Sequence, residues 1–162
     1  MKKQTFKFKH EMYSNGKSVS DGHFIAPIDH LTIAWKAPND QTTAALIKRE
    51  VFTWKNKVLS LNDCPDIQSF MHQEKEAIHE LTDTLLSWRA DTETTVCLYH
   101  SPVLGLIGID ATYQFLIEYV PIHTRDKFSP LFVKDCGIAI MPYTIDALNI
   151  TTMKYFFAEV IK

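Results

Sequence analysis

Residues 64–89 read CPDIQSFMHQEKEAIHELTDTLLSWR, and this stretch decides the fold because its hydrophobic period is the clearest in the chain. Asn62 and Asp63 before it are favourable N-cap residues, and Pro65 is tolerated in the first turn of a helix. Apolar side chains then recur at steps of three and four, which places them on one stripe of a helix: Ile67, Phe70, Met71, Ile78, Leu81, Leu85 and Trp88. The sequence therefore predicts an amphipathic helix that ends near Arg89.

The segments on either side of this helix have the patterns of strands. Residues 5–13 alternate apolar and polar side chains and lead into Asn15-Gly16, a strong turn signal. Branched and aromatic side chains predict further strands at 95–100 and 113–122, and a hairpin or an interrupted strand over 131–141. The predicted fold class is α+β, with a single domain over residues 1–162 in which a mostly antiparallel sheet packs against one or two amphipathic helices.

Two segments fit more than one kind of element. In residues 42–61 a helical stripe passes through Ala44, Ile47 and Val51, which favours a helix, yet a hairpin that turns at 55–57 fits the same residues. Residues 144–162 suit a helix or a strand, and we expect a short helical turn near 144–149 followed by a terminal strand. The sequence leaves both alternatives open.

Charge and composition exclude several classes of protein. The chain has 17 basic and 19 acidic side chains and a formal net charge of −2, so it has no overall basic field that would neutralise nucleic-acid phosphates. Its one basic cluster, at residues 2–9, alternates with phenylalanine, as on the solvent face of a strand. The longest apolar runs are too short and too interrupted to span a membrane. We therefore expect neither a nucleic-acid partner nor a membrane partner.

The cysteines and glycines bear on location and cofactors. Three cysteines without a CxxC pair do not form a disulfide framework, and no apolar run follows the first lysines as in a secretory signal. A reducing cytoplasm is the expected compartment. The five glycines form neither GxGxxG nor GxxxxGK, so we expect no nucleotide cofactor, and we expect no other cofactor.

His72, Glu76 and His79 are the side chains in the central stretch most suited to a site. Their spacing of four and three places two imidazoles and a carboxylate on one face of the predicted helix, and these are ligand types that zinc accepts. That face lies opposite Ile67 and Leu85, so water would surround it, whereas a catalytic metal needs a dry and supported shell. We expect no metal here and a face that contacts a partner protein.

Cys136, His100 and His123 are the candidates for catalysis. Cys136 lies in a predicted turn, and the two histidines end neighbouring predicted strands. A thiol, an imidazole and an acid that met at one end of a sheet would form a nucleophilic site. Free cysteine is more often a small buried side chain, so this group belongs to an alternative interpretation.

Arg125 and Lys127 are candidates for binding. They follow the predicted strand 113–122, where an acyl-CoA-dependent N-acetyltransferase places its pyrophosphate-binding turn. That turn needs glycines so that backbone N–H groups can approach phosphate, and none occurs between Gly108 and Gly137. The sequence does not identify that family, and the two cations are expected on an exposed loop or a binding rim.

Two classes of function follow from these patterns. In the first, the chain is a small soluble binding module that acts by occupying a protein partner, like an immunity protein, an antitoxin or another inhibitor. Abundant aromatic side chains, which anchor interfaces when exposed, favour it. The alternative is an enzyme or a small-ligand-binding protein with a pocket between the C-terminal strands and the helices, using acyltransferase-like or thiol-based chemistry.

Overall fold

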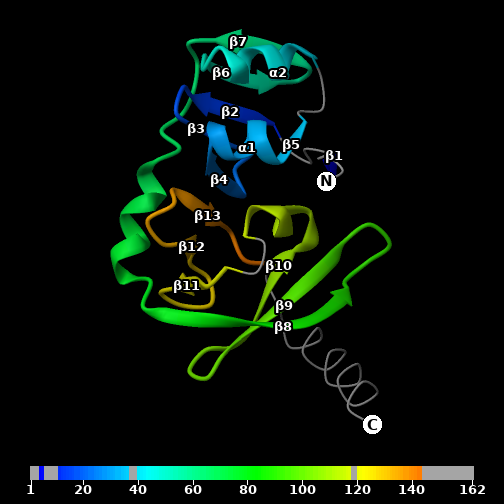
Figure 1. The fold of residues 1–162 in the computed structure, drawn as a ribbon, viewed down its shortest axis with the longest axis vertical. Coiled ribbons are helices and arrows are strands. Elements are labelled where there is room, and N and C mark those ends of the chain that lie inside the picture. Colours follow the sequence, from blue (N-terminus) through cyan, green and yellow to red (C-terminus); the bar gives the residue numbers. More distant parts are fainter. Residues whose placement is uncertain (1–3, 6–10, 37–39, 118–119, 144–162) are drawn as a thin grey trace.

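The computed structural model describes residues 4–5, 11–36, 40–117 and 120–143, and Figure 1 shows their arrangement. Its helical segments are short: α1 (Ile28–Ala34), α2 (Asp40–Ile47) and two 3₁₀ helices, η1 (Ser69–Glu76) and η2 (Ala111–Leu116). Its strands in chain order are β1 (Gln4–Thr5), β2 (Met12–Asn15), β3 (Ser18–Ser20), β4 (Phe24–Pro27), β5 (Trp35–Lys36), β6 (Val51–Lys55), β7 (Val58–Leu61), β8 (His79–Arg89), β9 (Thr95–Ser101), β10 (Gly105–Asp110), β11 (Ile122–Thr124), β12 (Leu131–Val133) and β13 (Ile138–Ile140).

Eleven of the described strands form one sheet in the order β10-β9-β8-β11-β12-β13-β4-β3-β2-β6-β7. All neighbours in it are antiparallel, whereas β1 and β5 form a separate parallel pair. The chain builds one end of the sheet with β2–β4, β6 and β7, and η1 then carries it along the sheet to β8–β10 at the other end (Figure 1). β11–β13, which come latest in the chain among the described strands, then form the middle of the sheet and join its two ends.

The two faces of the sheet are apolar in its central part. In β4, Phe24 and Ala26 belong to the main core, which also includes side chains of α1, α2 and η2. Ile25, between them, belongs to a second cluster with Ile67 and Ala77, which flank η1. This alternation follows from the two-residue period of a strand, and each large side chain it buries contributes about 1.5–3 kcal/mol.

Residues 64–89 do not form the predicted amphipathic helix. η1 covers eight residues of the stretch, and β8 covers its last eleven. Two residues of the predicted apolar stripe are largely in solvent, since Ile78 is 70% exposed and Leu85 is 77% exposed. Leu81 and Trp88 are both buried, but they belong to different hydrophobic clusters. The steps of three and four therefore did not mark one buried face, and the prediction of a sheet packed against one or two amphipathic helices was wrong.

Buried side chains on both faces of β8 explain how a strand came to have a helix-like spacing. The register of β8 with β9 shifts by two residues between Asp83 and Ser87, so odd-numbered residues keep the same face before and after this bulge. Leu85 lies in the bulge with φ 61° and is exposed. Leu81 and Trp88 are seven residues apart and are buried in different clusters, as expected for opposite faces of a strand, and this spacing also fits a helix.

The other predictions had mixed outcomes. The ambiguous residues 42–61 contain both alternatives, because α2 ends at Ile47 and a hairpin of β6 and β7 follows it. That hairpin turns at Asn56 and Lys57, whose φ angles of 51° and 63° fit a two-residue turn. The strand at 95–100 and the hairpin over 131–141 are confirmed by β9, β12 and β13. The strand predicted at 113–122 was wrong, because η2 occupies its first part, and residues 144–162 lie outside the described residues.

The predicted turn at Asn15-Gly16 is confirmed and shows why glycine is needed there. The Asn15 side chain accepts hydrogen bonds from the N–H groups of Lys17 (2.9 Å) and Ser18 (2.7 Å). Gly16 has φ 88°, and a Cβ at this position would lie 3.1 Å from the carbonyl oxygen of Arg49. Any residue with a Cβ would therefore be strained by this backbone angle and would also crowd the chain just before β6.

Candidate functional site

Three large apolar side chains are exposed at one end of the sheet. Ile78 directly precedes β8, Val103 lies in the turn between β9 and β10, and Phe128 lies in the loop between β11 and β12. Their side chains are 70%, 73% and 73% exposed, respectively. Because neighbouring strands run antiparallel, the start of β8, the end of β9, the start of β10 and the end of β11 meet at this end. We call these three residues the sheet-end patch.

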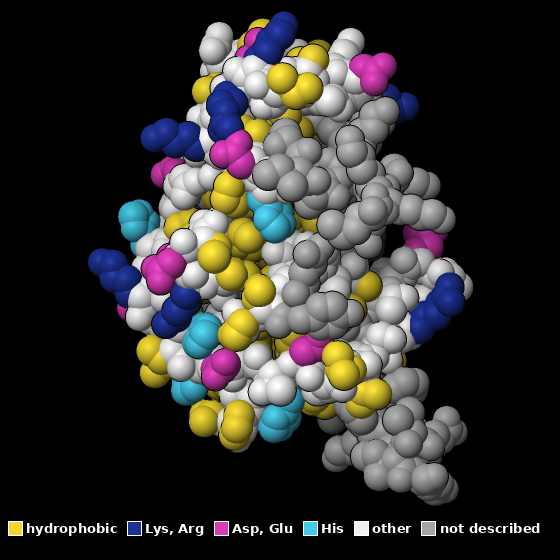
Figure 2. Space-filling model, viewed as in Figure 1, with side chains coloured by type: hydrophobic (Ala, Val, Ile, Leu, Met, Phe, Trp, Pro, Cys, Tyr) yellow, Lys and Arg dark blue, Asp and Glu magenta, His cyan; other side chains and the backbone are white. Residues whose placement is uncertain are grey.

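Figure 2 shows hydrophobic side chains and histidines gathered at this end of the molecule, at the lower left of the view. The loop that carries Phe128 also approaches the turn between β9 and β10, although β8 lies between their strands in the sheet. The Lys127 ammonium lies 3.8 Å from the position that a Cβ on Gly105 would occupy. The exposed apolar residues therefore belong to one surface rather than to separate loops.

The loop that presents Phe128 is held by polar contacts at its base. The Asp126 carboxylate accepts hydrogen bonds from the Phe128 N–H and the Ser129 hydroxyl, both at 2.9 Å. The Thr124 hydroxyl donates to the Asp126 carbonyl oxygen at 2.9 Å. The Phe128 N–H, followed by the Ser129 hydroxyl and the Arg125 guanidinium, lowers the pKa of the Asp126 carboxyl, because these contacts favour its ionised form. The loop is thus ordered although its phenylalanine is exposed.

Arg125 and Lys127, two of the predicted binding residues, flank this patch in different ways. The Arg125 guanidinium donates to Glu76 at 3.0 Å and to Asp126 at 3.2 Å, and these contacts raise its pKa. Arg125 therefore ties the end of η1 to the loop. Lys127 has no ion pair within the described part of the chain, so its charge is available beside Phe128.

The remaining predicted binding residues do not share one helix face. Glu76 is at the end of η1 and His79 is the first residue of β8, opposite Thr124 of β11, so both lie near the sheet-end patch. His72 lies farther back on η1, where it lines a separate hollow of about 410 Å³ with Glu74 and Asp135. The structure thus brings Glu76, His79, Arg125 and Lys127 to one end of the sheet and places His72 beside the β12–β13 turn.

The three candidates for catalysis are placed apart. His100 pairs with Thr82 across the sheet, and His123 pairs with Glu80, so the two histidines lie on β9 and β11 with β8 between them. At a strand spacing of about 4.8 Å, their Cα atoms are separated by roughly 10 Å or more. Cys136 is exposed in the β12–β13 turn. Because β11 and β12 are antiparallel, this turn lies near the start of β11, whereas the loop to β12 follows the end of β11. Among the described residues no hydrogen bond joins the thiol to either histidine, and a nucleophile and its base need such contact.

The other cysteines also lack the environment of an activated thiol. Burial, followed by the charges of neighbouring aspartates, raises the pKa of Cys64 and of Cys97. A raised pKa keeps a thiol protonated and therefore less nucleophilic at neutral pH. The described residues contain no cluster of three or more His, Cys, Asp or Glu side chains suited to a metal ion. Within those same residues, no helix has the length and apolar character needed to cross a membrane.

Sequence reasoning missed the residues that form the sheet-end patch. Ile78 was assigned to a buried helical stripe, and no pattern drew attention to Val103. Phe128 carried a usable signal, since it is a lone aromatic residue in the charged loop TRDKFSP at 124–130. An aromatic side chain in such a loop is either buried beneath it or exposed for contact, and here it is exposed.

Comparisons of this chain with protein-family models, with curated proteins and with solved structures found no match.

Proposed function

We propose that this protein is a binding module that occupies a partner protein through the sheet-end patch, in the manner of an immunity protein or another inhibitor. The observation that carries the proposal is the exposure of Ile78, Val103 and Phe128 at one end of the sheet. Large exposed apolar side chains that lie on one surface are typical of interaction sites, and aromatic residues are common anchors of such interfaces.

The ordered loop around Phe128 supports the same proposal. A loop that is already fixed by Asp126 and Thr124 loses little conformational freedom when a partner binds, so less of the binding energy is spent on ordering it. Lys127 adds a positive charge without an ion pair in the described residues. The partner surface that fits this arrangement has an apolar pocket for Phe128 and an acidic group for Lys127.

A photo-crosslinking experiment in cells that produce the protein tests the proposal. We expect a photoreactive phenylalanine analogue at Val103 to give one discrete adduct, and the same analogue at exposed Glu93, in the β8–β9 turn, to give none. The protein in that adduct is then purified and titrated against the full chain by calorimetry. We expect Phe128→Asp to weaken the measured affinity by about tenfold or more, because hot-spot residues contribute about 2 kcal/mol or more.

Folding is controlled by comparing thermal unfolding of Phe128→Asp with that of the unsubstituted chain. Phe128 is 73% exposed, so the two midpoints should be similar. The proposal is wrong if Phe128→Asp and Val103→Asp both bind the captured protein with unchanged affinity.

A further inference from the structure

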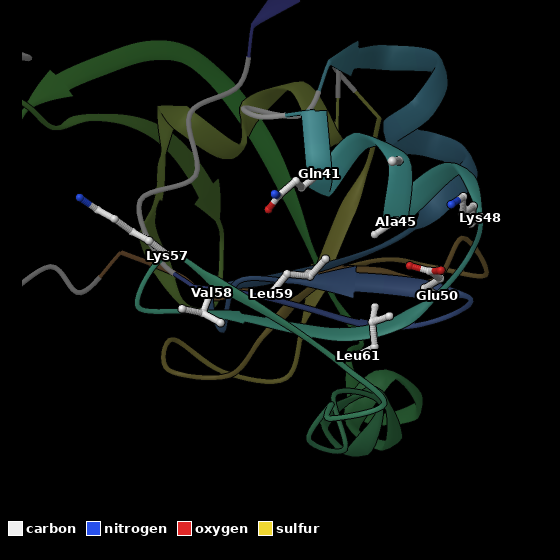
Figure 3. Close-up of a pocket in the computed structure, with 9 residues that line it drawn as sticks. Gln41, Ala45, Lys48, Glu50, Lys57, Val58, Leu59 and Leu61 are labelled. Carbon is white, nitrogen blue, oxygen red and sulfur yellow. The ribbon is translucent and has the colours of Figure 1, made fainter.

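A cleft lies at the opposite end of the sheet, between α2 and the β6–β7 hairpin (Figure 3). Its volume is about 590 Å³, which is in the range of clefts that bind ligands. Ala45 points from α2 toward the hairpin, and Leu59 and Leu61 point from β7 toward the helix (Figure 3). These residues, with Ala44, give the cleft an apolar floor and wall.

One side of this cleft is an open sheet edge. β7 is the last strand of the sheet, and no other strand of the described residues pairs with its outer side. The Asn62 N–H donates to the Val51 carbonyl oxygen at 2.6 Å, which identifies that pair as hydrogen-bonded. Hydrogen-bonded and non-bonded pairs alternate in an antiparallel ladder, so Leu61 (opposite Phe52) and Leu59 (opposite Trp54) form non-bonded pairs. Their N–H and C=O groups therefore point outward to the open edge.

Leu59 and Leu61 thus contribute to one site twice, through their outward-pointing backbone groups and through their side chains in the cleft. A strand placed beside β7 would form hydrogen bonds with Leu59 and Leu61, and its paired residues would direct their side chains under α2. The residue between them would point to the other face of the sheet, beside Ser60, which is exposed. The arrangement therefore selects an apolar-polar-apolar sequence in the added strand.

The rim of the cleft carries one neutral and three charged polar side chains. Gln41, Lys48, Glu50 and Lys57 line it, and in the described part of the chain their side chains form no hydrogen bond or ion pair. Lys57 lies in the turn directly before β7, whereas Lys48 and Glu50 lie on the side of Leu61 (Figure 3). The isolated positive charge at the Lys57 end complements an acidic residue in the ligand.

We propose that β7 and the α2 cleft form a binding site for an extended peptide segment of a protein, which adds to the sheet as a further strand. The segment places two apolar side chains, separated by one polar residue, between α2 and β7, and an acidic side chain beside Lys57. This site is independent of the sheet-end patch, because the two lie at opposite ends of the molecule (Figure 1).

The first test uses a phage-displayed library of random nonapeptides panned against the full chain. We expect the enriched peptides to share an apolar-polar-apolar pattern next to an acidic residue. A fluorescein-labelled synthetic copy of the leading peptide should then bind in solution, and the amide protons of Leu59 and Leu61 should become protected from hydrogen exchange. Recovery of peptides without this pattern, or binding without that protection, would overturn the proposal.

Two substitutions of Leu61 distinguish what its backbone and its side chain each contribute to peptide binding. Leu61→Pro removes an N–H that has no partner in β6, so the β6–β7 ladder should survive, while the peptide loses a hydrogen bond. Leu61→Ala keeps that N–H and removes only the side chain. We expect Leu61→Pro to weaken peptide binding by about tenfold and more than Leu61→Ala does. Should the two variants bind the peptide equally, strand addition is excluded.

A charge exchange tests the orientation and the acidic residue. Lys57→Glu should weaken binding of the selected peptide. The same variant should bind normally to a copy of the peptide in which lysine replaces the acidic residue. Lys55→Glu, an exposed change in β6 outside the cleft, is the matched control and should bind like the unsubstituted chain. Ultracentrifugation tests the rival occupant: a dimer that Leu61→Pro dissociates would show that β7 pairs with a second copy of the chain, and would refute a peptide ligand.

Discussion

At the scale of single residues, Asp21 and Tyr113 form the most informative contact of the core. Both are buried, and the Tyr113 hydroxyl donates to Asp21 at 2.6 Å. The other carboxylate oxygen of Asp21 accepts from the N–H groups of His23 (2.8 Å) and Phe24 (3.2 Å). The contact joins the β3–β4 turn to η2, and it gives the buried carboxyl group the donors that burial requires.

This contact predicts a loss of stability at alkaline pH. Burial, followed by the charge of Asp21, raises the pKa of Tyr113 above its ordinary value of 10.0. Because the folded state holds the phenolic proton more tightly than the unfolded state, the stabilisation is complete below pH 10.0 and is lost as the pH rises above it. Urea unfolding measured from pH 8 to 11 should show a decline that begins near pH 10.

The substitution Tyr113→Phe separates this effect from general alkaline unfolding. At pH 8 it should lower the free energy of unfolding by about 1.5–3 kcal/mol, because a hydrogen bond to a charged group is lost. It should also flatten the decline above pH 10. Tyr99→Phe is the control, since the Tyr99 hydroxyl donates to the neutral side-chain oxygen of Gln114 at 2.9 Å and should cost less. An equal loss in both variants would refute the role of the Asp21 charge.

At the scale of elements, the bulge in β8 is held by local hydrogen bonds. The Leu85 N–H donates to the Asp83 side chain at 2.9 Å, and the Leu86 N–H donates to the Thr84 hydroxyl at 3.2 Å. The same hydroxyl donates to the Leu98 carbonyl oxygen at 2.7 Å. These side chains replace the ladder contacts that the bulge interrupts, and they hold Leu85 at a positive φ that leucine rarely adopts.

Leu85→Gly is therefore expected to stabilise the protein. A left-handed backbone angle costs a residue with a Cβ about 1–2 kcal/mol, and glycine adopts it freely, although glycine gains entropy in the unfolded chain. Because Leu85 is 77% exposed, little burial is lost, and the free energy of unfolding should rise by up to about 1 kcal/mol in urea titrations. Leu86→Gly, at a half-buried neighbour, should lower it; a similar loss in both variants would contradict this account.

The elements also show what sequence patterns could and could not predict. Turns were predictable where the backbone angle depends on local residue type, as at Gly16 and in the alternative hairpin turn at Asn56. The fold of residues 64–89 was not, because β8 buries apolar side chains in two different clusters, and their spacing also fits a helix. The sheet-end patch was out of reach for a different reason. It depends on which strand ends meet, and β11 joins β8 only through long-range pairing.

At the scale of the whole molecule, the sheet has two ends that β11–β13 connect. β2–β4, β6 and β7 form one end, β8–β10 form the other, and β11–β13 pair with both. One apolar cluster continues through these parts, since it includes Phe52 of β6, Leu131 of β12 and Tyr99 of β9. The α2 cleft and the sheet-end patch therefore rest on a shared core rather than on separate ones.

This continuity predicts that both ends unfold together. Trp54 lies in β6 and Trp88 in β8, so variants that keep only one of them, with phenylalanine at the other tryptophan positions, report on opposite ends of the sheet. We expect the fluorescence midpoints in urea to coincide, because neither end can lose β11–β13 without exposing part of the shared cluster. Leu131→Ala, at a side chain 1% exposed in the middle of the sheet, should lower both midpoints equally and cost about 2–5 kcal/mol. Midpoints that separate, or a Leu131→Ala effect confined to one tryptophan, would show that the chain consists of two folding units that meet at β11–β13.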